Sequence, residues 1–308
     1  MNQRSTILTS GILFLSLGTF SAAEESTDPL SPGKVIEVTK ELHDRFKHKN
    51  DFYKKAVNAG GIWIFSSEKV DDRALLEARF LILSMLKARP DVLRAIVAKN
   101  IRIGVMAHDE FTNDIPEHSM LSDWWNKRAR GLGGNPVTCG EENVLNFEGD
   151  KYTGESILMH EFAHAIHHSG LTQVDDKFEE KLKTAYRNAK ATGLFEGYAM
   201  GTYGEFWAES SQSWFECNRN ELMLRRDKEG KRRPLKNRAD LKEYLPELAK
   251  LLAEGYGDNP WLYTRMDTRM QMPHLKGYDH GKAPKFVWPQ KVLDAYKAAE
   301  DKKAARRK

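Results

Sequence analysis

Cysteine is scarce in this sequence, with two residues among 308. Two cysteines exclude a small fold held together by several disulfides, and they exclude a zinc site built from four thiolates. Long apolar runs are also missing, since no segment reaches the roughly 18 consecutive apolar residues that a membrane-spanning helix needs. Hydrophobic residues make up 40% of the chain and charged residues 30%, a balance typical of a globular protein with a buried core.

A large excess of charge of one sign is absent too. The chain has 48 Lys and Arg against 44 Asp and Glu, which gives a net charge of +4. This charge is too small to indicate electrostatic binding of nucleic acid. Basic residues do cluster at 225–238 and 302–308, but no aromatic residues lie between them to stack on bases. We therefore expect no nucleic-acid partner.

The first 23 residues predict a cleavable signal peptide. Arg4 precedes the short apolar segment Ile7–Leu17, and the small residues Ser21, Ala22 and Ala23 follow it. The apolar segment is too short to span a membrane comfortably, so we expect cleavage after Ala23 and a secreted or periplasmic protein. The alternative is that this segment is retained as a buried helix or an anchor.

Export determines how the two cysteines are interpreted. In an oxidising compartment, Cys139 and Cys217 are expected to form one disulfide bond. The bond would close a loop of about 77 residues and stabilise the fold by up to about 4 kcal/mol in the chain-entropy model. The alternative is a pair of buried free thiols.

The rest of the chain is predicted to form one α/β domain. Residues 24–33 are polar and rich in Pro and Ser, which indicates a flexible mature N-terminus. Residues 34–308 are then expected to form a single domain with a C-terminal extension from about residue 220. Two apolar segments, 62–65 and 101–106, are predicted to be buried strands. Helices separate them, so we expect parallel pairing in a small mixed sheet, followed by a helical C-terminal half.

A further short strand is predicted at Val144–Phe147, just before a helix at about 155–168. A strand in this place could be an edge of the sheet that pairs with an extended peptide. An ordinary inner strand is the equal alternative.

The chemistry is concentrated in His160-Glu161-Phe162-Ala163-His164, an HExxH motif. Residues four apart share one face of a helix, so both imidazoles can reach one ion while Glu161 stands beside it. A catalytic zinc ion has three protein ligands and one open position, and the glutamate takes the proton from the metal-bound water. The alternative is a buried helix whose histidines hydrogen-bond to carboxylates.

The third ligand is not expected on the same helix. The extended pattern HExxHxxGxxH fails, because His167 and Gly170 stand where it requires Gly and His. His167 also lies seven residues after His160, about 10 Å along the helix axis, which is too far for both to bind one ion together with His164. We expect His167 and His168 to be ordinary polar residues at the end of the helix.

A carboxylate from a later helix is the better candidate. Glu205 and Glu209 are four residues apart, so they share a helical face in the segment 205–217. We expect Glu205 to be the ligand and Glu209 to support a ligand histidine, although plain salt bridges are the alternative. Three other acids are weaker candidates because they lie in a solvated run or stand alone: Glu179, Glu180 and Glu196.

This set of motifs resembles the gluzincin metallopeptidases, in particular the catalytic domain of anthrax lethal factor and its relatives. The resemblance covers roughly residues 35–220 and is specific only over 155–215. It rests on HEFAH, on a tyrosine about 35 residues later, and on Glu205-Phe-Trp-Ala-Glu209, in which Glu205 follows His164 by 41 positions. It implies a zincin-like fold with an active-site helix beneath a small mixed sheet.

The resemblance also implies roles for individual residues. His160, His164 and Glu205 correspond to the ligands of one Zn²⁺ ion, and Glu161 corresponds to the general base. Tyr198, seven residues before Glu205, corresponds to the hydroxyl that stabilises the oxyanion, with Tyr203 as the competing candidate. No relative of the toxin's receptor-binding or helical domains is recognised in this chain, so a substrate preference cannot be transferred.

The sequence therefore predicts a secreted zinc metallopeptidase that hydrolyses internal bonds of a peptide or protein substrate. One alternative is an exported, non-catalytic binding protein on a zincin scaffold. Another is a zinc amidase that acts on a non-protein amide. The sequence indicates neither the oligomeric state nor whether an N-terminal segment within residues 24–60 blocks the site.

Overall fold

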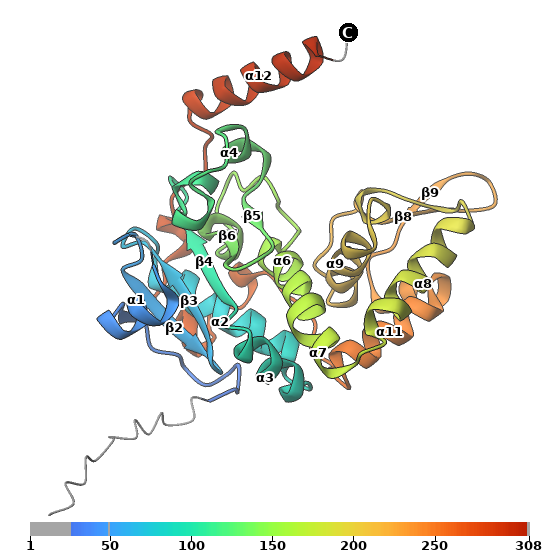
Figure 1. Cartoon of the computed structure of the whole chain (residues 1–308), viewed down its shortest axis with the longest axis horizontal. Helices are drawn as coiled ribbons and strands as arrows, with labels where there is room; N and C mark the ends of the chain where they lie inside the picture. Colours follow the sequence, from blue (N-terminus) through green and yellow to red (C-terminus); the bar gives the residue numbers. More distant parts are fainter. Residues whose placement is uncertain (1–25, 49, 307–308) are drawn as a thin grey trace, which may run out of the picture.

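The computed structural model describes residues 26–48 and 50–306. The predicted signal peptide, residues 1–23, lies outside the described residues. The described part has a mixed α/β fold built around a six-stranded sheet, as Figure 1 shows. The expected α/β class is therefore confirmed.

The central sheet has the strand order β1-β2-β3-β4-β6-β5. Its strands are β1 (Ile36–Glu37), β2 (Lys55–Ala59), β3 (Ile62–Ser66), β4 (Arg102–Met106), β5 (Gly131–Leu132) and β6 (Val137–Gly140). The strands β3, β4 and β6 are parallel to one another, whereas β1, β2 and β5 run antiparallel to their neighbours. Both strands predicted in the first half of the chain are confirmed, and they pair in parallel with Ile64 opposite Ile103.

Local sequence explains how the first strands are joined. Gly60 and Gly61 both have positive φ values, 62° and 100°, which lets two residues connect β2 to β3 in a tight hairpin. The parallel pair β3 and β4 needs a longer crossover, and α2 (Asp72–Leu86) and α3 (Pro90–Ala98) supply it. Asp71 caps α2, because its side chain accepts a hydrogen bond from the Arg73 N–H.

Side chains along β3 point to opposite faces of the sheet and pack into two separate cores. Ile62 and Ile64 belong to the main core, which α2, α5 (Glu141–Val144) and α6 (Ile157–Ala165) build on one face of the sheet. Phe65 belongs to a smaller core on the other face, where Phe46 of α1 (Lys40–Phe46) packs edge-on against it. The sheet is thus covered on both faces, and α6 is held against β6.

The second half of the chain is mainly helical. Its helices are α7 (Thr172–Val174), α8 (Phe178–Ala191), α9 (Tyr203–Trp214), α10 (Arg238–Tyr244), α11 (Pro246–Tyr256) and α12 (Gln290–Ala305). A small sheet accompanies them, made of β7 (Phe195–Glu196), β8 (Leu224–Arg226) and β9 (Arg232–Pro234). Many residues of the predicted C-terminal extension contribute to the main core, for example Leu252, Tyr256 and Leu275.

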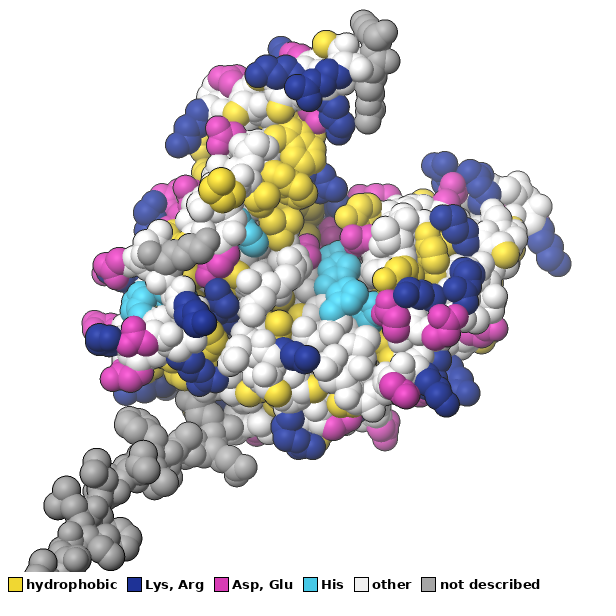
Figure 2. All heavy atoms as spheres, in the orientation of Figure 1, with side chains coloured by type: hydrophobic (Ala, Val, Ile, Leu, Met, Phe, Trp, Pro, Cys, Tyr) yellow, Lys and Arg dark blue, Asp and Glu magenta, His cyan; other side chains and the backbone are white. Residues whose placement is uncertain are grey.

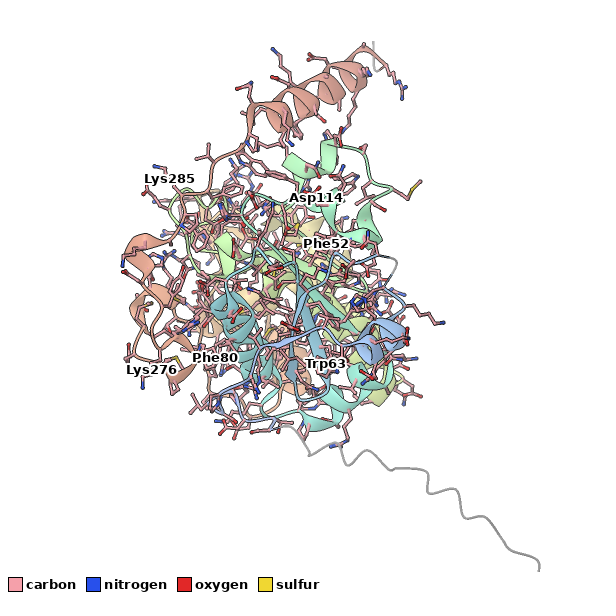
Figure 3. The ribbon with its side chains drawn as sticks, turned by 90° about the vertical axis from the view of Figure 1, so that its left-hand side faces the viewer. Phe52, Trp63, Phe80, Asp114, Lys276 and Lys285 are labelled. Carbon is pink, nitrogen blue, oxygen red and sulfur yellow. The ribbon has the colours of Figure 1, made fainter. Side chains whose placement is uncertain are left out.

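The helix α12 is arranged differently. It stands away from the rest of the molecule in two perpendicular views (Figures 1 and 3), and it contacts α4 (Trp124–Arg128). Trp124 stacks on Tyr296 and donates a hydrogen bond from Nε1 to the Glu300 carboxylate at 2.8 Å. Within residues 26–48 and 50–306, no helix has the length and apolar character required to cross a bilayer.

The strand predicted at Val144–Phe147 is wrong. Val144 ends the short helix α5, Asn146 has a positive φ of 53°, and the Phe147 N–H bonds back to the Glu142 carbonyl. The side chain of Asn143 holds this turn, since its Oδ1 accepts from the Ile157 N–H at the start of α6. Polar contacts of this kind outweigh the β propensity of a short apolar run.

The two cysteines are free and buried in the structure, without the expected disulfide between them. Cys139 lies on β6, and Cys217 follows α9, where its sulfur is 3.6 Å from that of Met159. Burial raises the pKa of both thiols well above the usual range, so neither is a reactive thiolate at neutral pH.

Candidate metal centre

The helix α6 carries the HExxH motif. Ser156 caps it by accepting a hydrogen bond from the Met159 N–H. Leu158, Phe162 and Ala163 are fully buried in the main core. The opposite face of α6 lies against α9, and the two histidines of the motif are on that side.

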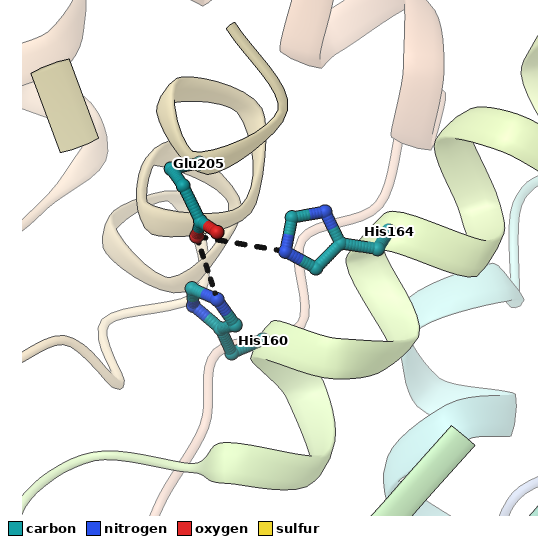
Figure 4. A group of neighbouring side chains, drawn as sticks. All are labelled: His160, His164 and Glu205. Carbon is teal, nitrogen blue, oxygen red and sulfur yellow. Dashed lines mark hydrogen bonds and ion pairs between the residues drawn. The ribbon is translucent and has the colours of Figure 1, made fainter. Parts of the chain in front are cut away.

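Glu205 meets both histidines of the motif. Its Oε2 lies 3.1 Å from His160 Nε2 and 3.6 Å from His164 Nε2. Figure 4 shows the two imidazoles on successive turns of α6, with the Glu205 carboxylate pointing at both from α9. The convergence expected from the sequence is therefore present in the structure.

These distances fit one metal ion. The donor atoms of the three residues all lie within 4.8 Å of one another. Bonds of about 2.1 Å at tetrahedral angles put neighbouring donor atoms about 3.4 Å apart, close to both measured separations. Two imidazole nitrogens and one carboxylate oxygen are also a donor set that suits zinc. His160, His164 and Glu205 could thus hold the ion with little rearrangement.

Packing of α9 explains why Glu205 arrives at this point. Thr202 caps α9 and accepts a hydrogen bond from the Glu205 N–H at 3.1 Å. Two residues later, the fully buried Trp207 donates from Nε1 to the Ala163 carbonyl of α6 at 3.0 Å. The two helices are therefore joined directly beside the three donor residues.

The ring of His160 is oriented by a residue that the sequence did not reveal. Its Nδ1 lies 3.1 Å from Oε1 of Gln212, a fully buried residue whose Nε2 donates to the Ser156 carbonyl at 3.0 Å. The amide orientation makes Nδ1 the protonated nitrogen and leaves Nε2 free for a metal. Glu209, the predicted partner, lies 3.4 Å from the same Nδ1. The sequence feature that could have indicated Gln212 is its spacing, because it follows Glu205 by two helical turns and so lies on the same face of α9.

We predict that Gln212→Ala weakens zinc binding by about 10–100-fold, the usual cost of removing the outer partner of a ligand histidine. Competition with a fluorescent zinc chelator measures this affinity. Gln173→Ala is the matched control, because Gln173 is exposed and lies on α7. Equal zinc affinity of Gln212→Ala and wild type would contradict this role for Gln212.

The electrostatics of the site favour a bound cation. Burial lowers the pKa of His160, but the Glu205 hydrogen bond and the charges of Glu161 and Glu209 raise it more, to about 10. Burial raises the pKa of Glu205, yet its contacts with the two histidines lower it well below the usual range. Two histidines among three carboxylates thus form a site that stabilises positive charge.

Glu161 lies beside the edge of the sheet. Burial raises its pKa above the usual value. A Cβ built on Gly133 would be 3.3 Å from Glu161 Oε2, and one on Gly131 would be 2.4 Å from a methyl carbon of Ile157. The edge strand β5 therefore approaches α6 so closely that only glycine fits at position 131, while a side chain at position 133 would require Glu161 to shift slightly. Glu161 thus lies directly against this edge of the sheet.

The structure brings Tyr198, rather than Tyr203, to the site. The Tyr198 hydroxyl donates to Glu205 Oε1 at 3.2 Å, and its ring centroid lies 6.3 Å from that of His160. Tyr203 instead packs edge-on against His167 and lies beneath the Lys183 ammonium group. Of the two candidates for the oxyanion donor, Tyr198 has the required position.

His167 forms a separate cluster. It is fully buried, and its Nε2 lies 2.6 Å from Glu179 Oε2, so the expectation that it is an ordinary residue at the helix end is wrong. The π-helical segment η3 (Ile166–Leu171) turns it inward. His168 is exposed as expected, and its ring stacks on that of His167 with centroids 4.0 Å apart. Glu179 also pairs with Lys183 at 3.0 Å, so we interpret this cluster as structural.

The candidate metal centre is accessible from outside. Figure 2 shows histidine side chains in a hollow between the part of the molecule that carries α4 and α12 and the part that carries α8 and α9. A pocket of about 150 Å³ opens here, and its lining includes His160, Glu161, Tyr198 and Arg128. Three of the five residues predicted from the sequence therefore line this pocket, and the other two, His164 and Glu205, lie next to them.

Comparisons with family models, curated proteins and solved structures found no match to this chain. The case for a function thus depends on the residues of the site and their geometry.

Proposed function

We propose that this protein is a zinc-dependent metallopeptidase with a zincin-like fold, exported from the cell. The observation that carries the proposal is the convergence of His160 Nε2, His164 Nε2 and Glu205 Oε2. These donors come from two helices, and 41 positions separate His164 from Glu205. Three ligands on one side leave a position for water, as in catalytic zinc sites. The adjacent Glu161 supplies the group that such a site needs for hydrolysis.

A zinc ion bound by these ligands would lower the pKa of a water molecule and polarise the scissile carbonyl. Glu161 accepts the proton of the attacking water and delivers it to the nitrogen of the leaving amine. The raised pKa of this buried carboxyl makes it a stronger base than an exposed glutamate. Tyr198 turns its O–H from Glu205 toward the oxygen that becomes negative.

The edge strand β5 supports a peptide as substrate. Among the described residues, β5 pairs with β6 alone, so its other edge has no strand partner, and Gly131 of β5 lies next to Glu161. An extended peptide can add to such an edge through main-chain hydrogen bonds, which fix the backbone with little dependence on side chains. In this proposal β5 is the edge strand that pairs with an extended peptide, the role that the sequence suggested for residues 144–147.

We predict that removing the metal abolishes peptide cleavage. Dialysis against 1,10-phenanthroline should eliminate cleavage of a peptide library by the protein, and one equivalent of Zn²⁺ should restore it, because the proposed hydrolysis depends on water activated by the metal. Mass spectrometry of the digest measures the cleavage and shows whether internal bonds are cut. Zinc binding without any cleavage would overturn the proposal and favour a non-catalytic binding protein.

A further inference from the structure

Three arginines line the pocket that contains the candidate metal centre: Arg128, Arg130 and Arg219. Arg130 is 1% exposed, and its guanidinium is paired with Glu142 at 2.6 Å. Arg219 is paired with Glu155, also at 2.6 Å. Arg128 differs from both, because no carboxylate oxygen of residues 26–48 or 50–306 lies within 4.0 Å of its guanidinium nitrogens. The pocket thus contains one exposed guanidinium without an ion-pair partner.

The fold places Arg128 where the reaction would occur. It is the last residue of α4, three residues before the edge strand β5. Arg128 and Tyr198 line the same pocket, together with His160 and Glu161. Burial and the charge of Glu205 raise the pKa of Tyr198 to about 12, and the charge of Arg128 acts against both effects. Arg128 therefore shares one pocket with the candidate oxyanion donor and the candidate metal centre.

Peptide hydrolysis needs positive charge near the carbonyl oxygen of the bond that is cleaved. As the water oxygen bonds to the carbonyl carbon, the carbonyl oxygen becomes negative, and fixed donors aimed at it lower the barrier. Arginine keeps its charge at every physiological pH and presents five N–H donors in a planar fork. A guanidinium already paired with a carboxylate, as in Arg130 or Arg219, would lose that pairing in order to help. Arg128 has no carboxylate partner among the described residues, so no ion pair has to break before it can donate to the carbonyl oxygen.

We propose that Arg128 is a catalytic residue that, together with Tyr198, donates a hydrogen bond to the carbonyl oxygen as it becomes negative. This inference rests on the proposed peptidase function. The proton balance is unchanged: the C–N bond breaks, Glu161 carries the proton from water to the departing nitrogen, and Arg128 neither gains nor loses a proton. Its contribution is greatest in the transition state, where the charge on the oxygen develops.

The test compares the zinc-loaded full chain with Arg128→Ala, Arg128→Lys and a control, Arg94→Ala, on a peptide that wild type cleaves. Arg94 is exposed on α3. For Arg128→Ala we expect kcat to fall about 100-fold, the cost of one oxyanion donor, while KM changes less than about threefold. Arg128→Lys should be intermediate, added guanidinium ion should partly restore Arg128→Ala, and Arg94→Ala should match wild type.

A second readout separates catalysis from structure. A phosphinic peptide that imitates the tetrahedral intermediate should bind Arg128→Ala more weakly by the same factor as the loss in kcat/KM, with zinc content unchanged. Unchanged kcat in Arg128→Ala, or a loss confined to KM, would overturn the inference and leave the peptidase intact. A wild type that cleaves no peptide would instead overturn the proposed function, and this inference with it.

Discussion

Glu161→Gln is expected to lower kcat for peptide cleavage by about 10²–10⁴-fold, the range by which a positioned general base accelerates proton transfer. The amide has nearly the same shape as the carboxylate, so it fills the space beside Gly133 without a clash. It cannot accept a proton from water, however, and cannot pass one to the leaving amine. Steady-state kinetics on a fluorogenic peptide measures the loss.

Zinc content distinguishes this chemical effect from a structural one. Glu161 is not among the three residues whose donor atoms converge, so zinc should remain bound in Glu161→Gln at one equivalent per chain. Glu196→Gln is a suitable control, because Glu196 lies in the small second sheet and pairs with Arg226. Retained activity in Glu161→Gln would remove this residue from its proposed role.

Glu205→Ala is expected to have the largest effect on the metal. Losing an outer partner of a ligand typically costs 10–100-fold in metal affinity, and loss of a ligand itself should cost more than about 100-fold. The two histidines that remain come from one helix and cannot enclose the ion. Inductively coupled plasma mass spectrometry after dialysis should find one zinc per wild-type chain and almost none in the variant.

Glu209→Gln serves as the matched control for Glu205→Ala. Glu209 lies one helical turn further along α9, is buried, and contacts the other nitrogen of the His160 ring. Burial raises its pKa to about 7, so a neutral amide is a mild replacement at neutral pH. We expect Glu209→Gln to keep most of the zinc. Equal zinc contents in Glu205→Ala and wild type would mean that Glu205 is not a ligand.

Sequence periodicity predicted the centre of this site well. The spacing of four residues places His160 and His164 on one face of α6, and the same spacing places Glu205 and Glu209 on one face of α9. Short-range helical geometry is sufficient for these predictions. That the two faces meet depends on long-range packing, here the hydrogen bond of Trp207 to α6, and the sequence only suggested it.

The surroundings of the site were harder to predict. Gln212 is 52 positions from His160, and nothing local marks a buried glutamine as the partner of a histidine. The edge strand β5 has two residues, one of them glycine, so it carries no periodic signal. Arg128 looks like any charged residue at the end of a short helix. Each of these residues acquires its role through contacts that only the folded chain creates.

The most direct test of the central idea is the coordination of the bound metal itself. X-ray absorption spectroscopy at the zinc edge on the zinc-loaded protein should show four light-atom neighbours at about 2.0–2.2 Å, two of them with the scattering pattern of imidazole. In Glu205→Gln, the shell of oxygen neighbours should change, while the imidazole signal persists. A wild-type spectrum with sulfur neighbours at about 2.3 Å, or with fewer than two imidazoles, would contradict a site formed by His160, His164 and Glu205.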